Sequence, residues 1–116
     1  MSRRALALAL AVFAPSAAAL EVAAGDCREA AQFIGNAARA RDNGIGKAAF
    51  VARFDEDVVI LDSIPAAQRW FVHGPAEAEF LRAAIVEVFD APRAPIRHSA
   101  DFLAACLQHV ADDSAG

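Results

Sequence analysis

The sequence predicts an all-α protein, a four-helix up-and-down bundle behind a cleaved signal peptide and tied by one disulfide. Alanine is abundant, and apolar residues recur at helical spacing in four segments that short links separate. Long alternating runs of β-branched residues, typical of strands, are missing from the sequence. An even number of cysteines, two, stands near the two ends of the predicted bundle.

The N-terminal segment has the order of a secretory signal peptide. Arg3 and Arg4 precede an uncharged apolar run over residues 5–13. This run is much shorter than the roughly 20 residues that a membrane-spanning helix needs. We therefore expect residues 1–19 to direct export to the periplasm, or secretion, without leaving a membrane anchor.

Two cleavage sites fit the small-residue rule for signal peptides. Residues 17–19, all alanine, predict cleavage before Leu20, and residues 22–24 offer an alternative cleavage before Gly25. The remaining chain, residues 20–116, has the length of a single domain and is small enough for a covalent tie to matter.

The charge balance narrows the classes of partner. The full chain has a formal charge of −4, with 11 basic and 15 acidic residues. Loss of Arg3 and Arg4 with the signal leaves 9 basic and 15 acidic residues, hence −6. Nucleic acids and anionic membranes reward clustered positive charge, so we expect neither as a partner. A cationic partner is compatible with this charge, which also serves ordinary solubility.

The first two helices are predicted from caps and periodicity. Asp26 is expected as the N-cap of a helix over residues 27 to about 41, which Asn43-Gly44 ends. A second helix is expected from about Gly46-Lys47 to Asp62-Ser63. Their predicted buried residues are Ala30, Phe33, Ile34, Ala37 and Ala38 in the first helix, and Phe50, Val51, Phe54, Val58 and Leu61 in the second.

The last two helices follow from proline signals. Gly74-Pro75 opens a third helix, and Ala91-Pro92 ends it. A fourth helix is expected from residues 96 to about 111. Their predicted buried residues are Phe80, Leu81, Ala84, Ile85, Val88 and Phe89 in the third helix, and Ile96, Ala100, Leu103, Cys106, Leu107 and Val110 in the fourth.

The topology brings the two cysteines together. In an up-and-down bundle the start of the first helix and the end of the fourth lie at the same end. Cys27 and Cys106 occupy these places, so we expect an intramolecular disulfide between them. An intermolecular disulfide and two buried free thiols are the alternatives, and the sequence leaves the oligomeric state open.

The sequence shows no convincing catalytic or metal-binding pattern. His98 and His109 share a predicted helix but lie about 16 Å apart along its axis, too far to hold one metal ion. The acidic residues 55–57 point in different directions around a helix and are expected to face water. We expect no cofactor, no metal and no enzyme activity.

The segment Arg69-Trp70-Phe71-Val72-His73 places three large apolar residues in a connector. Trp and Arg dominate interface hot spots, so Arg69, Trp70, Phe71 and His73 are candidate partner-binding residues. The alternative interpretation is a plug over one end of the bundle, with the rings buried and Arg69 and His73 facing water.

Three patterns together resemble small signal-bearing helical periplasmic proteins of proteobacteria. They are Arg41-Asp42-Asn43-Gly44-Ile45, Arg69-Trp70-Phe71-Val72 and the stretch of residues 80–89. The resemblance spans nearly all of the chain after the signal and implies export and a helical fold, but no particular activity.

These observations favour a non-enzymatic module that binds or inhibits another periplasmic protein. One alternative is a chaperone-like protein of acid or envelope stress, in which carboxylates and histidines supply the change in charge. The other is an enzyme that uses His73 or His98 as its general base.

Overall fold

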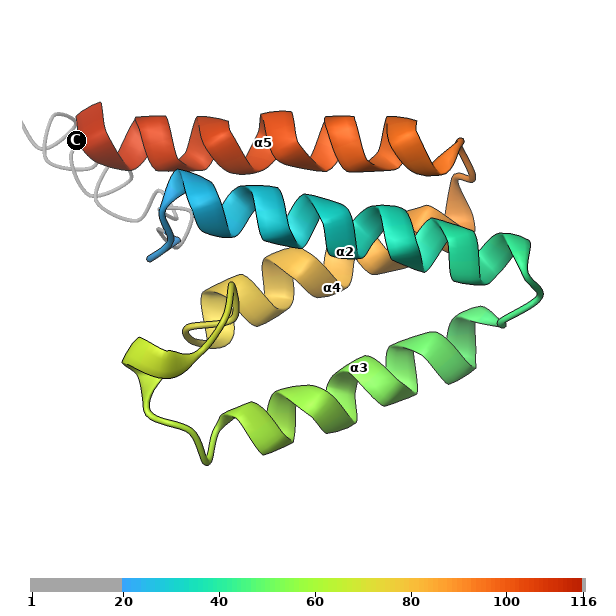
Figure 1. Cartoon of the computed structure of the whole chain (residues 1–116), viewed down its shortest axis with the longest axis horizontal. Coiled ribbons are helices and arrows are strands. Elements are labelled where there is room, and N and C mark those ends of the chain that lie inside the picture. The colour runs from blue at the N-terminus through green and yellow to red at the C-terminus, as the bar shows by residue number, and fades with distance from the viewer. Residues whose placement is uncertain (1–19, 116) are drawn as a thin grey trace, which may run out of the picture.

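The structure is a computed structural model that describes residues 20–115, with side chains described for residues 20–110. In this part of the chain there are four α-helices, a single turn of 3-10 helix and no strand: α2 (Ala24–Asp42), α3 (Lys47–Leu61), η1 (Ala66–Gln68), α4 (Pro75–Asp90) and α5 (Pro95–Ala115). Successive helices run in opposite directions (Figure 1). The predicted four-helix bundle is therefore confirmed, while the predicted signal peptide lies outside the described residues.

The start of α2 differs from the prediction. The helix begins at Ala24 with Ala23 as its N-cap, so Asp26 is not the N-cap. Asp26 instead lies in the first turn, where its Oδ2 accepts a hydrogen bond from the Ala23 N–H at 3.0 Å. A carboxylate there satisfies a free backbone donor and faces the positive end of the helix dipole. The acid stabilises the helix start as expected, but from inside the helix.

The other helix ends follow their local signals. Gly44 has φ of +96°, a backbone conformation that favours glycine. This turn ends α2 and lets the amide N–H of Ile45 donate to the Ala40 carbonyl at 3.0 Å. Pro75 is the first residue of α4, as predicted. The helix α5 extends to Ala115, beyond the predicted end near residue 111.

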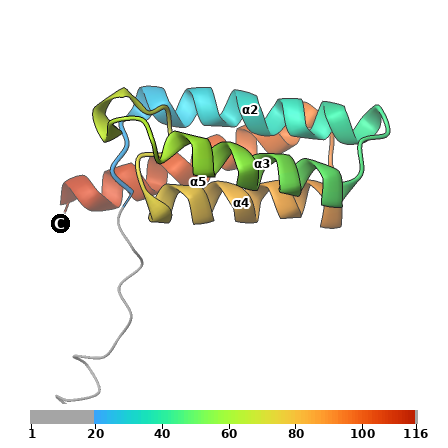
Figure 2. The same cartoon turned by 90° about the horizontal axis from the view of Figure 1, so that it is seen from below.

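The helices pack as two central and two outer elements. The closest packing is between α2 and α5, followed by α2 with α4 and α3 with α4. Thus α2 and α4 touch across the diagonal of the bundle, and α5 and α3 flank them (Figures 1 and 2). The pairs α2 with α3 and α4 with α5 do not close tightly, and a groove lies along each.

Small side chains let α2 and α5 approach closely. The buried face of α2 consists largely of alanines together with Gly35. A Cβ atom at Gly35 would lie 3.5 Å from the Cβ of Ser99. At one end of this helix pair, Cys27 and Cys106 form a disulfide with a Cα–Cα distance of 5.7 Å, and both are fully buried. This confirms the predicted bridge, which closes the chain over 79 residues.

The buried face of α5 is rotated from the predicted one. Ile96 was expected in the core, but 78% of its surface is exposed. The buried positions are His98, Phe102 and Cys106, spaced by four residues. Residues two apart on a helix point about 200° away from each other, so Ile96 faces solvent when His98 faces the core. Phe102 is a core residue that the prediction lacked.

Candidate functional site

The connector between α3 and α4 is held by Arg69. Its Nε donates to the Ile64 carbonyl at 2.7 Å, and its Nη1 donates to the His73 carbonyl at 3.0 Å. The Nη2 atom lies 3.3 Å from the Asp62 carbonyl. These three contacts occupy the guanidinium with the backbone of its own loop, and Arg69 is only partly exposed, so the expectation that it faces water holds in part. It organises the loop that carries the aromatic residues.

His73 links this loop to the start of α2. Its Nδ1 lies 3.2 Å from the Ala66 carbonyl, and its Nε2 lies 3.6 Å from Oδ2 of Asp26. The imidazole is only partly exposed between these groups. The expectation that His73 faces water therefore holds only in part.

The two aromatic residues of the connector have different surroundings. Phe71 is fully buried, and its ring lies 5.9 Å from that of Phe102 and 6.4 Å from that of Phe80. Trp70 is only half-buried and packs edge-on against Phe33, with 5.4 Å between ring centroids. Phe71 therefore belongs to the core as a plug, while part of Trp70 remains accessible.

Trp70 lies at one end of an apolar depression between α2 and α3. We call this depression the α2/α3 groove, and it is lined by Phe33, Phe54, Asp57, Val58, Ile60, Leu61 and Trp70. Ile60 is 61% exposed, and its neighbour Val59 is 69% exposed. Elsewhere α3 is held to α4 by ion pairs of Lys47 with Asp90 at 2.8 Å and Arg82 with Asp55 at 3.0 Å. On its α2 side, α3 packs through Phe50 and Phe54 against Phe33, with ring centroids 6.0 and 6.3 Å apart, and the groove opens beside these rings.

The rim of the α2/α3 groove is acidic. Asp57 lies on it and pairs only loosely, at 3.4 Å, with the exposed Arg53. Glu56 and Asp62 are exposed neighbours on the same helix and its end. Among the ion pairs of the described residues, none involves Glu56 or Asp62. The groove lining itself thus combines apolar side chains with one carboxylate, that of Asp57.

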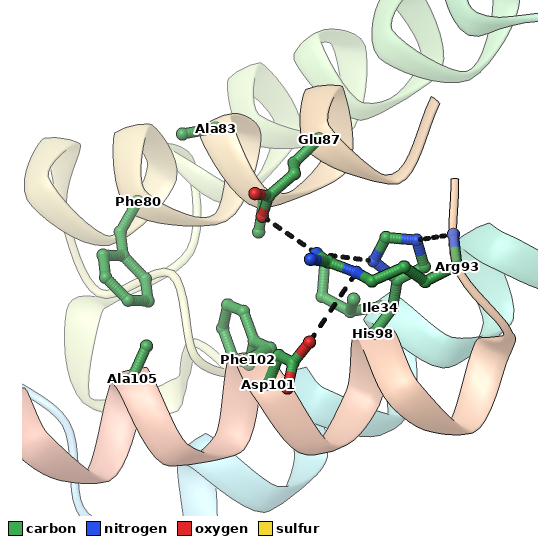
Figure 3. Close-up of a pocket in the computed structure, with 10 residues that line it drawn as sticks. Ile34, Phe80, Ala83, Glu87, Arg93, His98, Asp101, Phe102 and Ala105 are labelled. Atoms are coloured by element: carbon green, nitrogen blue, oxygen red, sulfur yellow. Dashed lines mark hydrogen bonds and ion pairs between the residues drawn. The ribbon is translucent and has the colours of Figure 1, made fainter. Parts of the chain in front are cut away.

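The second groove, between α4 and α5, combines apolar walls with a charged end (Figure 3). Phe80 and Phe102 face each other at the apolar part, with ring centroids 5.5 Å apart. At the other end Arg93 lies between two carboxylates, 3.4 Å from Glu87 and 3.6 Å from Asp101. Arg93 therefore bridges α4 and α5 through these two ion pairs.

His98 lies buried at the base of this charged end. Its Nε2 accepts a hydrogen bond from the Arg93 backbone N–H at 2.8 Å. The Arg93 side chain reaches Nδ1 at 3.3 Å, and Nη1 of Arg41 reaches Nε2 at 3.3 Å. Burial, followed by the positive charges of Arg93 and Arg41, lowers the pKa of His98 below its usual 6.5. These effects favour the neutral ring, whose Nε2 lone pair already accepts the Arg93 N–H.

Arg41 joins three elements near His98. Its Nη1 donates to the Val88 carbonyl and its Nη2 to the Arg93 carbonyl, both at 2.8 Å. The same guanidinium pairs with Asp42 at 2.9 Å. Arg41 thus ties the end of α2 to the end of α4 and to the connector before α5. The sequence signal for it was the Arg41-Asp42-Asn43-Gly44-Ile45 pattern, which carried no indication of these distant partners.

A comparison with protein-family models, with curated proteins and with solved structures finds no match to this chain. Among residues 20–110, whose side chains are described, there is no group of three or more His, Cys, Asp or Glu side chains arranged to hold a metal ion. Within residues 20–115, no helix is long and apolar enough to cross a membrane.

Proposed function

We propose that this chain is an exported, non-enzymatic module that binds another protein, and that the α2/α3 groove is its docking surface. The observation that carries the proposal is the half-buried Trp70 in an apolar groove whose lining includes Ile60, an isoleucine that is 61% exposed. Contiguous exposed apolar surface on a small protein marks an interaction site, and Trp is enriched at binding hot spots. The Cys27–Cys106 disulfide supports export, because such bonds persist in oxidising compartments.

The charge around the groove selects the class of partner. Asp57 lines its α3 side, and the chain as a whole has a formal charge of −4. Complementary charge steers association and disfavours partners of the same sign. The partner is therefore a protein segment that presents apolar side chains flanked by Lys and Arg, such as a basic amphipathic helix.

Synthetic helical peptides test this assignment directly. One peptide carries leucines on one face and lysines on the other, and a second carries glutamates in place of the lysines. Trp70 is the only tryptophan of the chain, so its fluorescence reports on the groove. We expect the lysine peptide to shift the emission and to bind more weakly as salt increases, while the glutamate peptide leaves the spectrum unchanged. Equal response to both peptides would contradict the assignment.

A matched pair of variants distinguishes binding in the groove from nonspecific hydrophobic binding. Ile60→Asp places a charge in the groove, whereas Ile96→Asp changes a similarly exposed isoleucine on α5, outside it. We expect Ile60→Asp to weaken binding of the lysine peptide by about tenfold or more, as for a hot-spot residue. Ile96→Asp should leave the dissociation constant unchanged. Equal losses in the two variants would rule out the groove as the docking surface.

The surroundings of His98 favour a second candidate function, a chaperone-like response to acid. His98 faces Arg41 from α2, Arg93 from the connector, Glu87 from α4 and Asp101 from α5. A proton added to Nε2 would remove the acceptor of the Arg93 N–H and place a third positive charge beside two guanidiniums. Acid would thereby loosen the junction of α2, α4 and α5 and expose the apolar walls of the α4/α5 groove.

Aggregation assays at low pH test this second candidate. We expect the wild-type chain to suppress aggregation of an acid-denatured client protein near pH 4 but not at pH 7. His98→Gln keeps an acceptor for the Arg93 N–H without the titration, so it should lose part of this activity. A wild-type chain that suppresses no aggregation at any pH would eliminate the candidate.

A further inference from the structure

Glu77 is a buried carboxylate in the first turn of α4, with 2% of its surface exposed. Buried acids are rare in proteins unless a positive charge or hydrogen bonds compensate them. Its Oε2 accepts one hydrogen bond from the backbone N–H of Glu21 at 2.9 Å. In the described part of the chain no Lys, Arg or His side chain forms an ion pair with Glu77.

The short segment before α2 belongs to the folded domain. Leu20 is 3% exposed and is part of the hydrophobic core, against which Val22 also packs. Ala23 is the N-cap of α2, and its N–H bonds to the carboxylate of Asp26. Cleavage before Gly25 would remove Leu20, Val22 and Ala23 together with the Glu21 donor. Cleavage before Leu20 would keep every one of them.

We infer that the mature chain begins at Leu20 and that its α-ammonium group is the ion partner of the buried Glu77 carboxylate. Consecutive Cα atoms are only about 3.8 Å apart, so the nitrogen of Leu20 lies close to the Glu21 N–H that already touches Glu77. The inference rests on the proposed export but not on the α2/α3 groove.

Cleavage of the signal peptide would create a positive charge that can pair with the Glu77 carboxylate. A signal peptidase adds water across the peptide bond between residues 19 and 20. The new carboxylate departs with residues 1–19, and the nitrogen of Leu20, previously a neutral amide, becomes an amine that takes up a proton. An α-amino group titrates near pH 8, so this amine is positively charged at neutral pH. The domain thus gains the partner of Glu77 only when it is released from its signal.

The first measurement is the N-terminal sequence and intact mass of the full chain exported by a secreting bacterial host. We expect a mature protein that starts at Leu20. A start at Gly25 would overturn this inference and leave the export proposal standing. An uncleaved chain would overturn both.

A double-mutant cycle then measures the ion pair. Insertion of Gly-Ser between residues 19 and 20 keeps the predicted cleavage site but moves the ammonium two residues away from Glu77. Glu77→Gln removes the charge and keeps an acceptor for the Glu21 N–H, and Glu79→Gln is an exposed control in the same helix. We expect the insertion to lower the folded-to-unfolded ratio about tenfold in the otherwise wild-type chain and in the Glu79→Gln control. In the Glu77→Gln chain the insertion should have no effect on this ratio. The same loss in all three chains would overturn the ion pair.

A spectroscopic readout covers the case in which Glu77→Gln does not fold. Reductive methylation with carbon-13 labels the α-amine, and its NMR signal follows protonation. The amine should titrate at a higher pH when Leu20 is the first residue than when Gly-Ser precedes it, because a carboxylate favours the charged form. Equal titration midpoints would overturn the pairing.

Discussion

The indole of Trp70 lies edge-on against the ring of Phe33, with 5.4 Å between centroids and planes inclined by 69°. The rings of Trp70 and Phe71 also pack together, with 6.2 Å between centroids, so the two residues link the α2/α3 groove to the core. Neighbours in sequence therefore have separable roles. Trp70 offers a surface, and Phe71 fills the space between α4 and α5.

Alanine substitutions should separate these roles. Phe71→Ala leaves a cavity in the core and should lower the free energy of unfolding by about 3–5 kcal/mol. Trp70→Ala removes a half-buried ring and should cost clearly less, while it weakens binding of the lysine peptide. Urea denaturation and peptide titration measure the two effects. A Trp70→Ala chain as unstable as Phe71→Ala would assign both residues to the core.

Stability should depend on pH through His98. The pKa of His98 in the folded chain lies below 6.5, so as pH falls through 6.5 the unfolded chain takes up this proton first. The contribution of His98 to stability is therefore complete above pH 6.5 and is lost as pH falls through the folded pKa. The His98→Gln variant should lack this part of the loss of stability at low pH. Urea denaturation between pH 4 and 8 tests it, and identical slopes for the two proteins would contradict the prediction.

Loss of the disulfide should be the most damaging covalent change. The bridge between Cys27 and Cys106 closes a loop of 79 residues in sequence, which corresponds to roughly 4–5 kcal/mol in the chain-entropy description. The double variant Cys27→Ala, Cys106→Ala should lose about that much stability. Reduced wild-type protein provides the matched control, because it lacks the bridge but retains both sulfur atoms. If both proteins unfold at the same urea concentration as the oxidised chain, the bridge does not stabilise the fold.

Gly35 should accept one methyl group and no more. A Cβ atom there would lie 3.5 Å from the Ser99 Cβ and 3.6 Å from the Pro95 carbonyl, which are ordinary contacts. Gly35→Ala should therefore fold and gain up to about 1 kcal/mol from helix propensity. Gly35→Leu would push α5 away from α2 and should cost about 1–3 kcal/mol. Thermal unfolding of both variants checks the sign of each change, and a loss in Gly35→Ala would contradict the contact geometry.

Local chemistry made several features predictable. Gly44 and Pro75 fix a helix end and a helix start by their own backbone preferences, whatever lies around them. The Cys27–Cys106 bridge followed from topology, since antiparallel helices of similar length bring these two positions together. Such features depend on residues within one turn or on the order of the helices alone.

Features that depend on the rotation of a helix or on distant partners were not predictable. Periodicity on α5 allowed several apolar stripes. The contacts of Phe102 with Phe71 and with Phe80 of α4 selected the stripe with Phe102 over the one with Ile96. Asp26 could serve as N-cap or first-turn acid, because the same side chain suits both places. Arg41 acts on carbonyls 47 and 52 residues away, which no local pattern encodes.

The position of the disulfide also determines how the molecule would respond to force. Cys27 and Cys106 enclose α3, α4 and nearly all of α2 in one covalent loop. A pull applied to the two ends of the oxidised chain would pass through the sulfur bridge and bypass that loop. Only the chain outside it could lengthen, so the grooves would keep their shape under tension until the bridge is reduced.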